Sequence, residues 1–95
     1  MAKILYIEDI QDNITFVEKV VQSRGHEFLF AKNAESGLEL AVTSQPDLIL
    51  LDLGLPDADG QTLSVWLKGN PTLASTPIIV LTAWPQEVAR QTVEA

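Results

Sequence analysis

The chain has 95 residues, of which 46% are hydrophobic, so we expect one domain with a modest core. Thirteen acidic and six basic side chains give a formal net charge of −7. This charge argues against nucleic-acid binding, because phosphate backbones attract clusters of Lys and Arg. The lack of cysteine excludes disulfides and thiolate metal sites and favours the cytoplasm as the compartment. We find neither a signal-peptide layout nor an apolar run near the roughly 18 residues that span a bilayer, and we expect no membrane partner.

The first half of the chain alternates between strand and helix patterns. Residues 4–7 are an unbroken apolar run, which is typical of a strand buried on both faces. A helix is predicted next, with Ile14 and Val17 at helical spacing, Asp12 as its N-cap and Gly25 as its stop. Residues 27–31 are the second predicted strand, and Asn33 is the expected cap of a second helix.

The second half continues the alternation. Residues 48–51 and 78–81 are two more apolar runs and are predicted as the third and fourth strands. Between them lie a loop rich in Pro, Asp and Gly at residues 54–60 and a helix around residues 62–68. Pro85 can occupy the first turn of a final helix that continues to Val93.

Strands that alternate with helices imply parallel strands joined by right-handed crossovers. We therefore expect an α/β fold with a doubly wound parallel sheet over residues 1–95. In such folds ligands bind beyond the carboxyl ends of the strands. Glu8 and Asp9 follow the first predicted strand, and Asp52 ends the third, its expected neighbour. The sheet is predicted to bring these three carboxylates together.

Neighbouring carboxylates repel one another unless a cation neutralises them, which favours Mg²⁺ as a cofactor. Because Mg²⁺ prefers oxygen ligands, Asp9, Asp52 and a carbonyl near Gly54 would suffice on the protein side. Thr82 ends the fourth predicted strand with a hydroxyl that can bind a phosphoryl oxygen, and Ala83 leaves its backbone N–H accessible.

These residues resemble the signature of the response-regulator receiver family over essentially the whole chain. The resemblance is carried by Glu8-Asp9, by Asp52 within the segment LLDLGLPDADG, and by Thr82-Ala83. It implies a flavodoxin-like receiver fold and a phosphoacceptor signalling domain rather than an enzyme. It further implies that Asp52 accepts a phosphoryl group from a sensor histidine kinase or a phosphotransfer protein.

The resemblance also implies roles for the other residues of the signature. Glu8, Asp9, Asp52 and the Gly54 carbonyl would hold Mg²⁺. Thr82 would be the switch hydroxyl. The Ala83 backbone N–H would bind the phosphoryl group.

The sequence departs from the family pattern at its end. Receivers have a fifth strand that ends in a lysine and a fifth helix, and the sequence stops at Ala95, so we expect a fold without the last β-α unit. Lys32 is a weak candidate to replace that lysine. An unpaired fourth strand, or an uncovered face that includes Phe16 and Val20, would favour a homodimer.

Two other functions stay open. A receiver fold without the chemistry would act as an interaction or dimerisation module, indifferent to Asp52→Asn. A phosphatase of the haloacid-dehalogenase type also uses a strand-end aspartate, but it requires a second aspartate where Gly54 stands, so we disfavour it. Asp57 and Asp59 are interpreted as turn residues rather than metal ligands.

Overall fold

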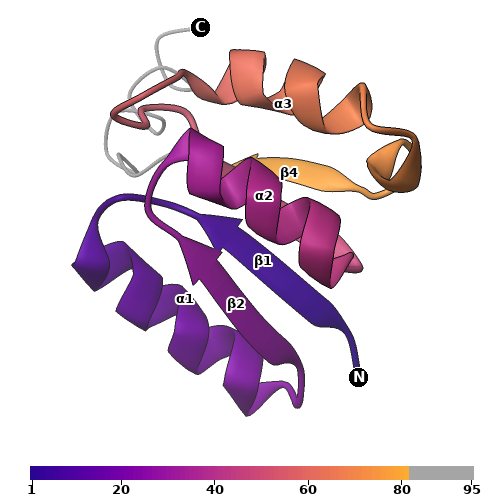
Figure 1. Ribbon diagram of the computed structural model, residues 1–95. Helices are drawn as coiled ribbons and strands as arrows, with labels where there is room; N and C mark the ends of the chain where they lie inside the picture. The colour runs from indigo at the N-terminus through magenta and orange to yellow at the C-terminus, as the bar shows by residue number, and fades with distance from the viewer. Residues whose placement is uncertain (82–95) are drawn as a thin grey trace, which may run out of the picture.

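The computed structural model describes residues 1–81 and confirms the predicted alternation of strands and helices in that part of the chain (Figure 1). The elements are β1 (Lys3–Ile7), α1 (Gln11–Ser23), β2 (Glu27–Ala31), α2 (Ala34–Ser44), β3 (Leu48–Asp52), α3 (Gly60–Lys68), the short 3-10 helix η1 (Pro71–Leu73) and β4 (Ile78–Leu81). None of these helices is long and apolar enough to cross a membrane. The predicted helix at residues 85–93 lies outside the described residues.

The four strands form one parallel sheet in the order β2-β1-β3-β4. The register pairs Ile7 of β1 with Ala31 of β2 and with Leu51 of β3. All strands therefore end at one edge of the sheet. The prediction that the first and third strands are neighbours is confirmed.

Helices cover both faces of the sheet, as expected for a doubly wound fold. Alternate residues of β1 and β3 point into one core, which α2 and α3 cover with Ala34, Ala41, Leu63 and Leu67. Figure 1 shows α2 crossing in front of the sheet. Ile14 and Val21 of α1 are buried outside that core, and α1 packs against β2, so α1 covers the opposite face.

The start of α1 differs from the prediction. The helix begins at Gln11 with Ile10 as its N-cap and without a side-chain cap, so the prediction of Asp12 as the cap is wrong. Asp12 lies in the first turn, where a carboxylate interacts favourably with the helix dipole. The predicted stop is confirmed, because Gly25 has a left-handed φ of 79° and its N–H donates to the Gln22 carbonyl.

The other two helices have side-chain caps. Asn33 accepts a 2.8 Å hydrogen bond from the Ser36 N–H, which confirms its predicted role at the start of α2. Helix α3 begins at Gly60 rather than near Thr62, because Asp59 caps it by accepting a 2.7 Å bond from the Thr62 N–H. The loop between β3 and α3 therefore covers residues 53–59, whereas the sequence predicted residues 54–60.

Candidate functional site

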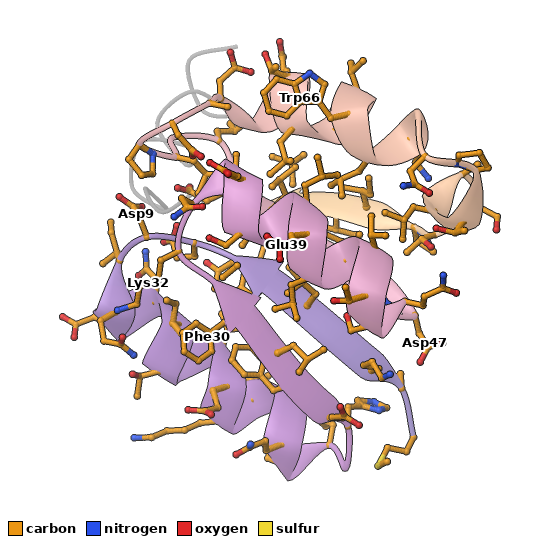
Figure 2. The ribbon with its side chains drawn as sticks, viewed as in Figure 1. Asp9, Phe30, Lys32, Glu39, Asp47 and Trp66 are labelled. Atoms are coloured by element: carbon orange, nitrogen blue, oxygen red, sulfur yellow. The ribbon has the colours of Figure 1, made fainter. Side chains whose placement is uncertain are left out.

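Three carboxylates meet at the edge where the parallel strands end. Glu8 directly follows β1 and Asp52 is the last residue of β3, and one oxygen each from Glu8, Asp9 and Asp52 lies within 4.8 Å of the others. Glu8 is 0% and Asp52 5% exposed, whereas Asp9 faces solvent. Figure 2 shows Asp9 just beyond the end of β1. The cluster is thus buried on one side and open on the other.

The pKa values of Glu8 and Tyr6 are both raised, because each side chain is buried and lies close to other acids. The pKa of Glu8 is raised to about 7, first of all by burial; the hydrogen bond from Asn13 lowers it, and the side-chain contact with Asp52 and the charges of Asp52 and Asp9 raise it. Burial, followed by the charges of Glu8 and Asp52, also raises the pKa of Tyr6, so its phenol stays neutral near the cluster. Negative charge is therefore costly at this site.

Glu8 is held firmly, yet one of its oxygens lacks a partner. Its N–H donates a 2.9 Å hydrogen bond to the Ala31 carbonyl, and its Oε1 accepts a hydrogen bond from the Asn13 side chain. Its Oε2 is buried without a hydrogen-bond partner. A cation bound by the three carboxylates would supply that partner and offset their repulsion, so this all-oxygen set fits a hard cation such as Mg²⁺.

The loop after Asp52 is tight and closely packed. Gly54 pairs with Asp59 in an antiparallel bridge, and the Gly60 N–H donates a 2.9 Å hydrogen bond to the Leu53 carbonyl. A Cβ on Gly60 would lie 2.8 Å from the Asp52 carbonyl oxygen, and one on Gly54 would lie 4.0 Å from Asp52 Oδ2. Gly54 thus lies near the Asp52 carboxylate, and the role of its carbonyl as a metal ligand stays a prediction.

Asp57 and Asp59 bind backbone N–H groups, in agreement with their interpretation as turn residues. Asp59 caps α3, and Asp57 binds the N–H groups of Ala34 and Glu35 at the start of α2. These hydrogen bonds lower the pKa of both carboxyl groups. Neither residue joins the carboxylate cluster.

Sequence reasoning missed Asn13, whose side chain reaches Glu8 from the first turn of α1. The signal was its position just after the acidic pair, at a helix start. Thr82 and Ala83 lie outside the described residues, so their roles stay predictions.

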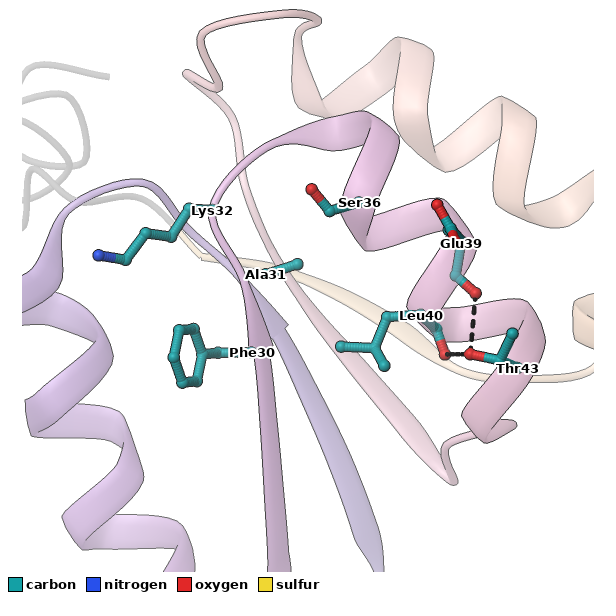
Figure 3. Close-up of a pocket in the computed structure, with 7 residues that line it drawn as sticks. All are labelled: Phe30, Ala31, Lys32, Ser36, Glu39, Leu40 and Thr43. Atoms are coloured by element: carbon teal, nitrogen blue, oxygen red, sulfur yellow. Dashed lines mark hydrogen bonds between the residues drawn. The ribbon is translucent and has the colours of Figure 1, made fainter.

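The role of Lys32 as a replacement for the lysine at the end of the family's fifth strand also stays a prediction. Lys32 is exposed and follows β2 at the same edge of the sheet as the cluster. It lines a groove of about 410 Å³ between β2 and α2, together with Phe30, Ser36 and Glu39. Figure 3 shows its side chain directed away from Ser36 and Glu39.

The model of the response regulator receiver domain family matches residues 4–95, and the chain belongs to this family. The response regulator DivK of Brucella anthropi is 32% identical over 81 residues, 85% of this chain and 66% of its own length. PleD of Caulobacter vibrioides is 34% identical over 82 residues, which are 86% of this chain and 18% of PleD. The chain thus spans slightly less than two thirds of DivK and a small part of PleD.

Solved structures of receiver proteins have the same fold as this chain. The receiver domain of a signal transduction histidine kinase from Syntrophus aciditrophicus has a TM-score of 0.82 and 30% identity, covering 97% of this chain and 71% of that one. The chemotaxis response regulator CheY4 of Vibrio cholerae has a TM-score of 0.85 and 25% identity, covering 96% and 76%. The predicted flavodoxin-like receiver fold is confirmed.

Proposed function

We propose that this chain is a cytoplasmic phosphoacceptor of a two-component system, which takes a phosphoryl group on Asp52 in a Mg²⁺-dependent reaction. The observation that carries the proposal is the cluster of Glu8, Asp9 and Asp52, whose oxygens lie within 4.8 Å in a chain of the receiver family. The partnerless Oε2 of Glu8 supports a cation at this point. The donor would be a sensor histidine kinase or a phosphotransfer protein.

The chemistry assigned to Asp52 is a nucleophilic displacement at phosphorus. One carboxylate oxygen of Asp52 attacks the phosphorus of a phosphohistidine in line, and the bond from phosphorus to the imidazole nitrogen breaks. The imidazole leaves with its electron pair, and Asp52 becomes an acyl phosphate. A Mg²⁺ ion held by Glu8, Asp9, Asp52 and the Gly54 carbonyl would neutralise charge on the phosphoryl oxygens.

The remaining proposed roles concern the response to phosphorylation. Phosphorylation replaces the −1 charge of the Asp52 carboxylate with a charge of roughly −1.5 to −2 on the phosphoryl oxygens at the end of β3. The Thr82 hydroxyl and the Ala83 N–H would bind its oxygens, and the movement of Thr82 would change the neighbouring surface. This role is that of a signalling switch rather than of an enzyme.

The test is the intact mass of the chain after incubation with acetyl phosphate and Mg²⁺. We expect one phosphoryl adduct on the wild type, no adduct when EDTA replaces Mg²⁺, and no adduct on Asp52→Asn. Asp12→Asn is the matched control, because Asp12 is an exposed acid of the first turn of α1 outside the cluster, and it should be phosphorylated like the wild type. A folded wild-type chain that gains no mass would contradict the proposal.

A second candidate function is an interaction module that forms a homodimer. The observation that favours it is the apolar surface of α1, where Phe16 is 69% and Val20 47% exposed. These residues are four apart in one helix and therefore lie on one face. In that function Asp52→Asn would leave self-association unchanged.

A further inference from the structure

Asn13 joins α1 to the acidic cluster. It is the third residue of the helix, and its backbone N–H donates a 3.1 Å hydrogen bond to the Ile10 carbonyl, which fixes its backbone. Its side-chain Nδ2 donates to Oε1 of Glu8. When Glu8 is ionised, as a metal ligand must be, the amide nitrogen faces it, because the amide oxygen would repel a carboxylate.

This hydrogen bond matters because the first acid of the pair is a glutamate. A glutamate side chain has one more rotatable bond than an aspartate, so it loses more rotamer freedom when a ligand fixes it. Asn13 occupies Oε1 and leaves Oε2 as the buried oxygen without a partner. One hydrogen bond thus decides both the orientation of the carboxylate and which oxygen is available.

We propose that Asn13 is a positioning residue of the metal site, which holds Glu8 so that Oε2 is directed to a divalent cation shared with Asp9 and Asp52. The inference rests on the proposed function, because it assigns a role toward the same cation. Asn13 itself is not a ligand, since its amide nitrogen is a donor and is directed at Glu8.

The expected size of the effect follows from the behaviour of residues that orient metal ligands. Removing such a partner typically weakens metal binding by about 10- to 100-fold. Asn13 acts on one of several ligands, so we expect Asn13→Ala to weaken Mg²⁺ binding about tenfold. The loss must depend on the Glu8 carboxylate, because Asn13 acts only through it.

A double-mutant cycle tests this dependence. Mg²⁺ dissociation constants are measured by calorimetric titration for the wild type, Asn13→Ala, Glu8→Gln and the double variant. We expect Asn13→Ala to weaken binding about tenfold in the wild type and less than about twofold in the Glu8→Gln background. The matched control is Gln11→Ala, which removes another side chain of the first turn, bonded to Thr15 rather than to Glu8, and should bind Mg²⁺ like the wild type.

A second measurement needs no substitution at Asn13. The chain has three asparagines, and Asn70 caps η1, which lies between α3 and the start of β4, away from the edge where the strands end. In NMR spectra of the wild type, Mg²⁺ should shift the side-chain NH₂ resonances of Asn13 and leave those of Asn70 in place. Mg²⁺ binding with no response of Asn13, or with equal affinity in Asn13→Ala, overturns the positioning role alone. A wild type that binds no Mg²⁺ overturns the proposed function as well.

Discussion

The carboxylate of Asp57 accepts a 2.6 Å hydrogen bond from the backbone N–H of Ala34, which joins the loop after β3 to the start of α2. Its second oxygen accepts a 3.0 Å bond from the Glu35 N–H, and Asn33 accepts from the Ser36 N–H. The first three N–H groups of α2, which lack partners inside the helix, are thus all bonded. The loop that follows Asp52 is thereby fastened to α2.

Asp57→Ala should lower the melting temperature and speed amide exchange at Ala34 and Glu35, because both N–H groups lose their acceptor. Asp57→Asn keeps one acceptor oxygen, so its melting temperature and exchange rates should lie between those of the wild type and Asp57→Ala. The hydrogen bonds lower the pKa of Asp57 from 3.8, so its contribution is present above pH 3.8 and is lost on acidification below it. Amide exchange at Ala34 and Glu35, measured by NMR, tests this prediction. Glu39→Gln is the control, because it removes an exposed charge from the middle of α2. Unchanged exchange at Ala34 and Glu35 in Asp57→Ala would show that the contact is dispensable.

Gly60→Ala should destabilise the fold by about 1–3 kcal/mol, because overpacking forces the backbone to shift. The added Cβ would lie 2.8 Å from the Asp52 carbonyl oxygen and 3.0 Å from the Leu53 Cα, and neither atom belongs to a flexible side chain. Mg²⁺ affinity should fall too, since the shift displaces Asp52. Urea denaturation and a Mg²⁺ titration measure both effects.

Gly69→Ala is the control for Gly60→Ala. A Cβ on Gly69 would come no closer than 3.4 Å to its nearest neighbour, the Val65 carbonyl oxygen, and φ is −72°, which alanine adopts without strain. The Gly69→Ala variant should therefore be as stable as the wild type, or more stable by less than about 1 kcal/mol. Equal stability of the two variants would mean that the loop adjusts freely around Gly60.

The strands and the carboxylate cluster were predictable, because unbroken apolar runs mark buried strands and parallel strands end at one edge. The helix ends were predictable only in part. Asn33 caps as expected, but the residue type of Asp12 did not reveal that it lies inside the first turn. The contacts of Asp57 and Asn13 could not be predicted from local patterns. Asp57 binds a residue 23 positions away, and Asn13 reaches Glu8 only because β1 ends in a buried carboxylate.

In the absence of divalent cations, the stability of the chain should fall as the pH rises from 4.5 to 7. The pKa of Glu8 is raised from 4.5 to about 7, so its neutral form is favoured in the folded chain. The contribution of this protonated group is complete below pH 4.5 and is lost as the pH rises through about 7. We expect a loss on the order of 2 kcal/mol in EDTA, measured by urea denaturation against Glu8→Gln, which stays neutral. Mg²⁺ should restore stability at pH 7 in the wild type more than in the variant, and parallel pH profiles for the two chains would contradict this account.

The exposed pair of Phe16 and Val20 on α1 should mediate self-association, because apolar side chains on one helix face gain by leaving water. In sedimentation equilibrium we expect the apparent mass of the wild type to rise above 10.4 kDa with concentration. The double variant Phe16→Ser, Val20→Ser should stay near that mass, with stability changed by less than about 1 kcal/mol since both sites are on the surface. Val65→Ser is the control, because Val65 is 70% exposed on a different helix and should not alter association. A wild type that remains at the monomer mass at high concentration would exclude the homodimer. If Val65→Ser reduced association as much as the double variant does, the contact could not be assigned to α1.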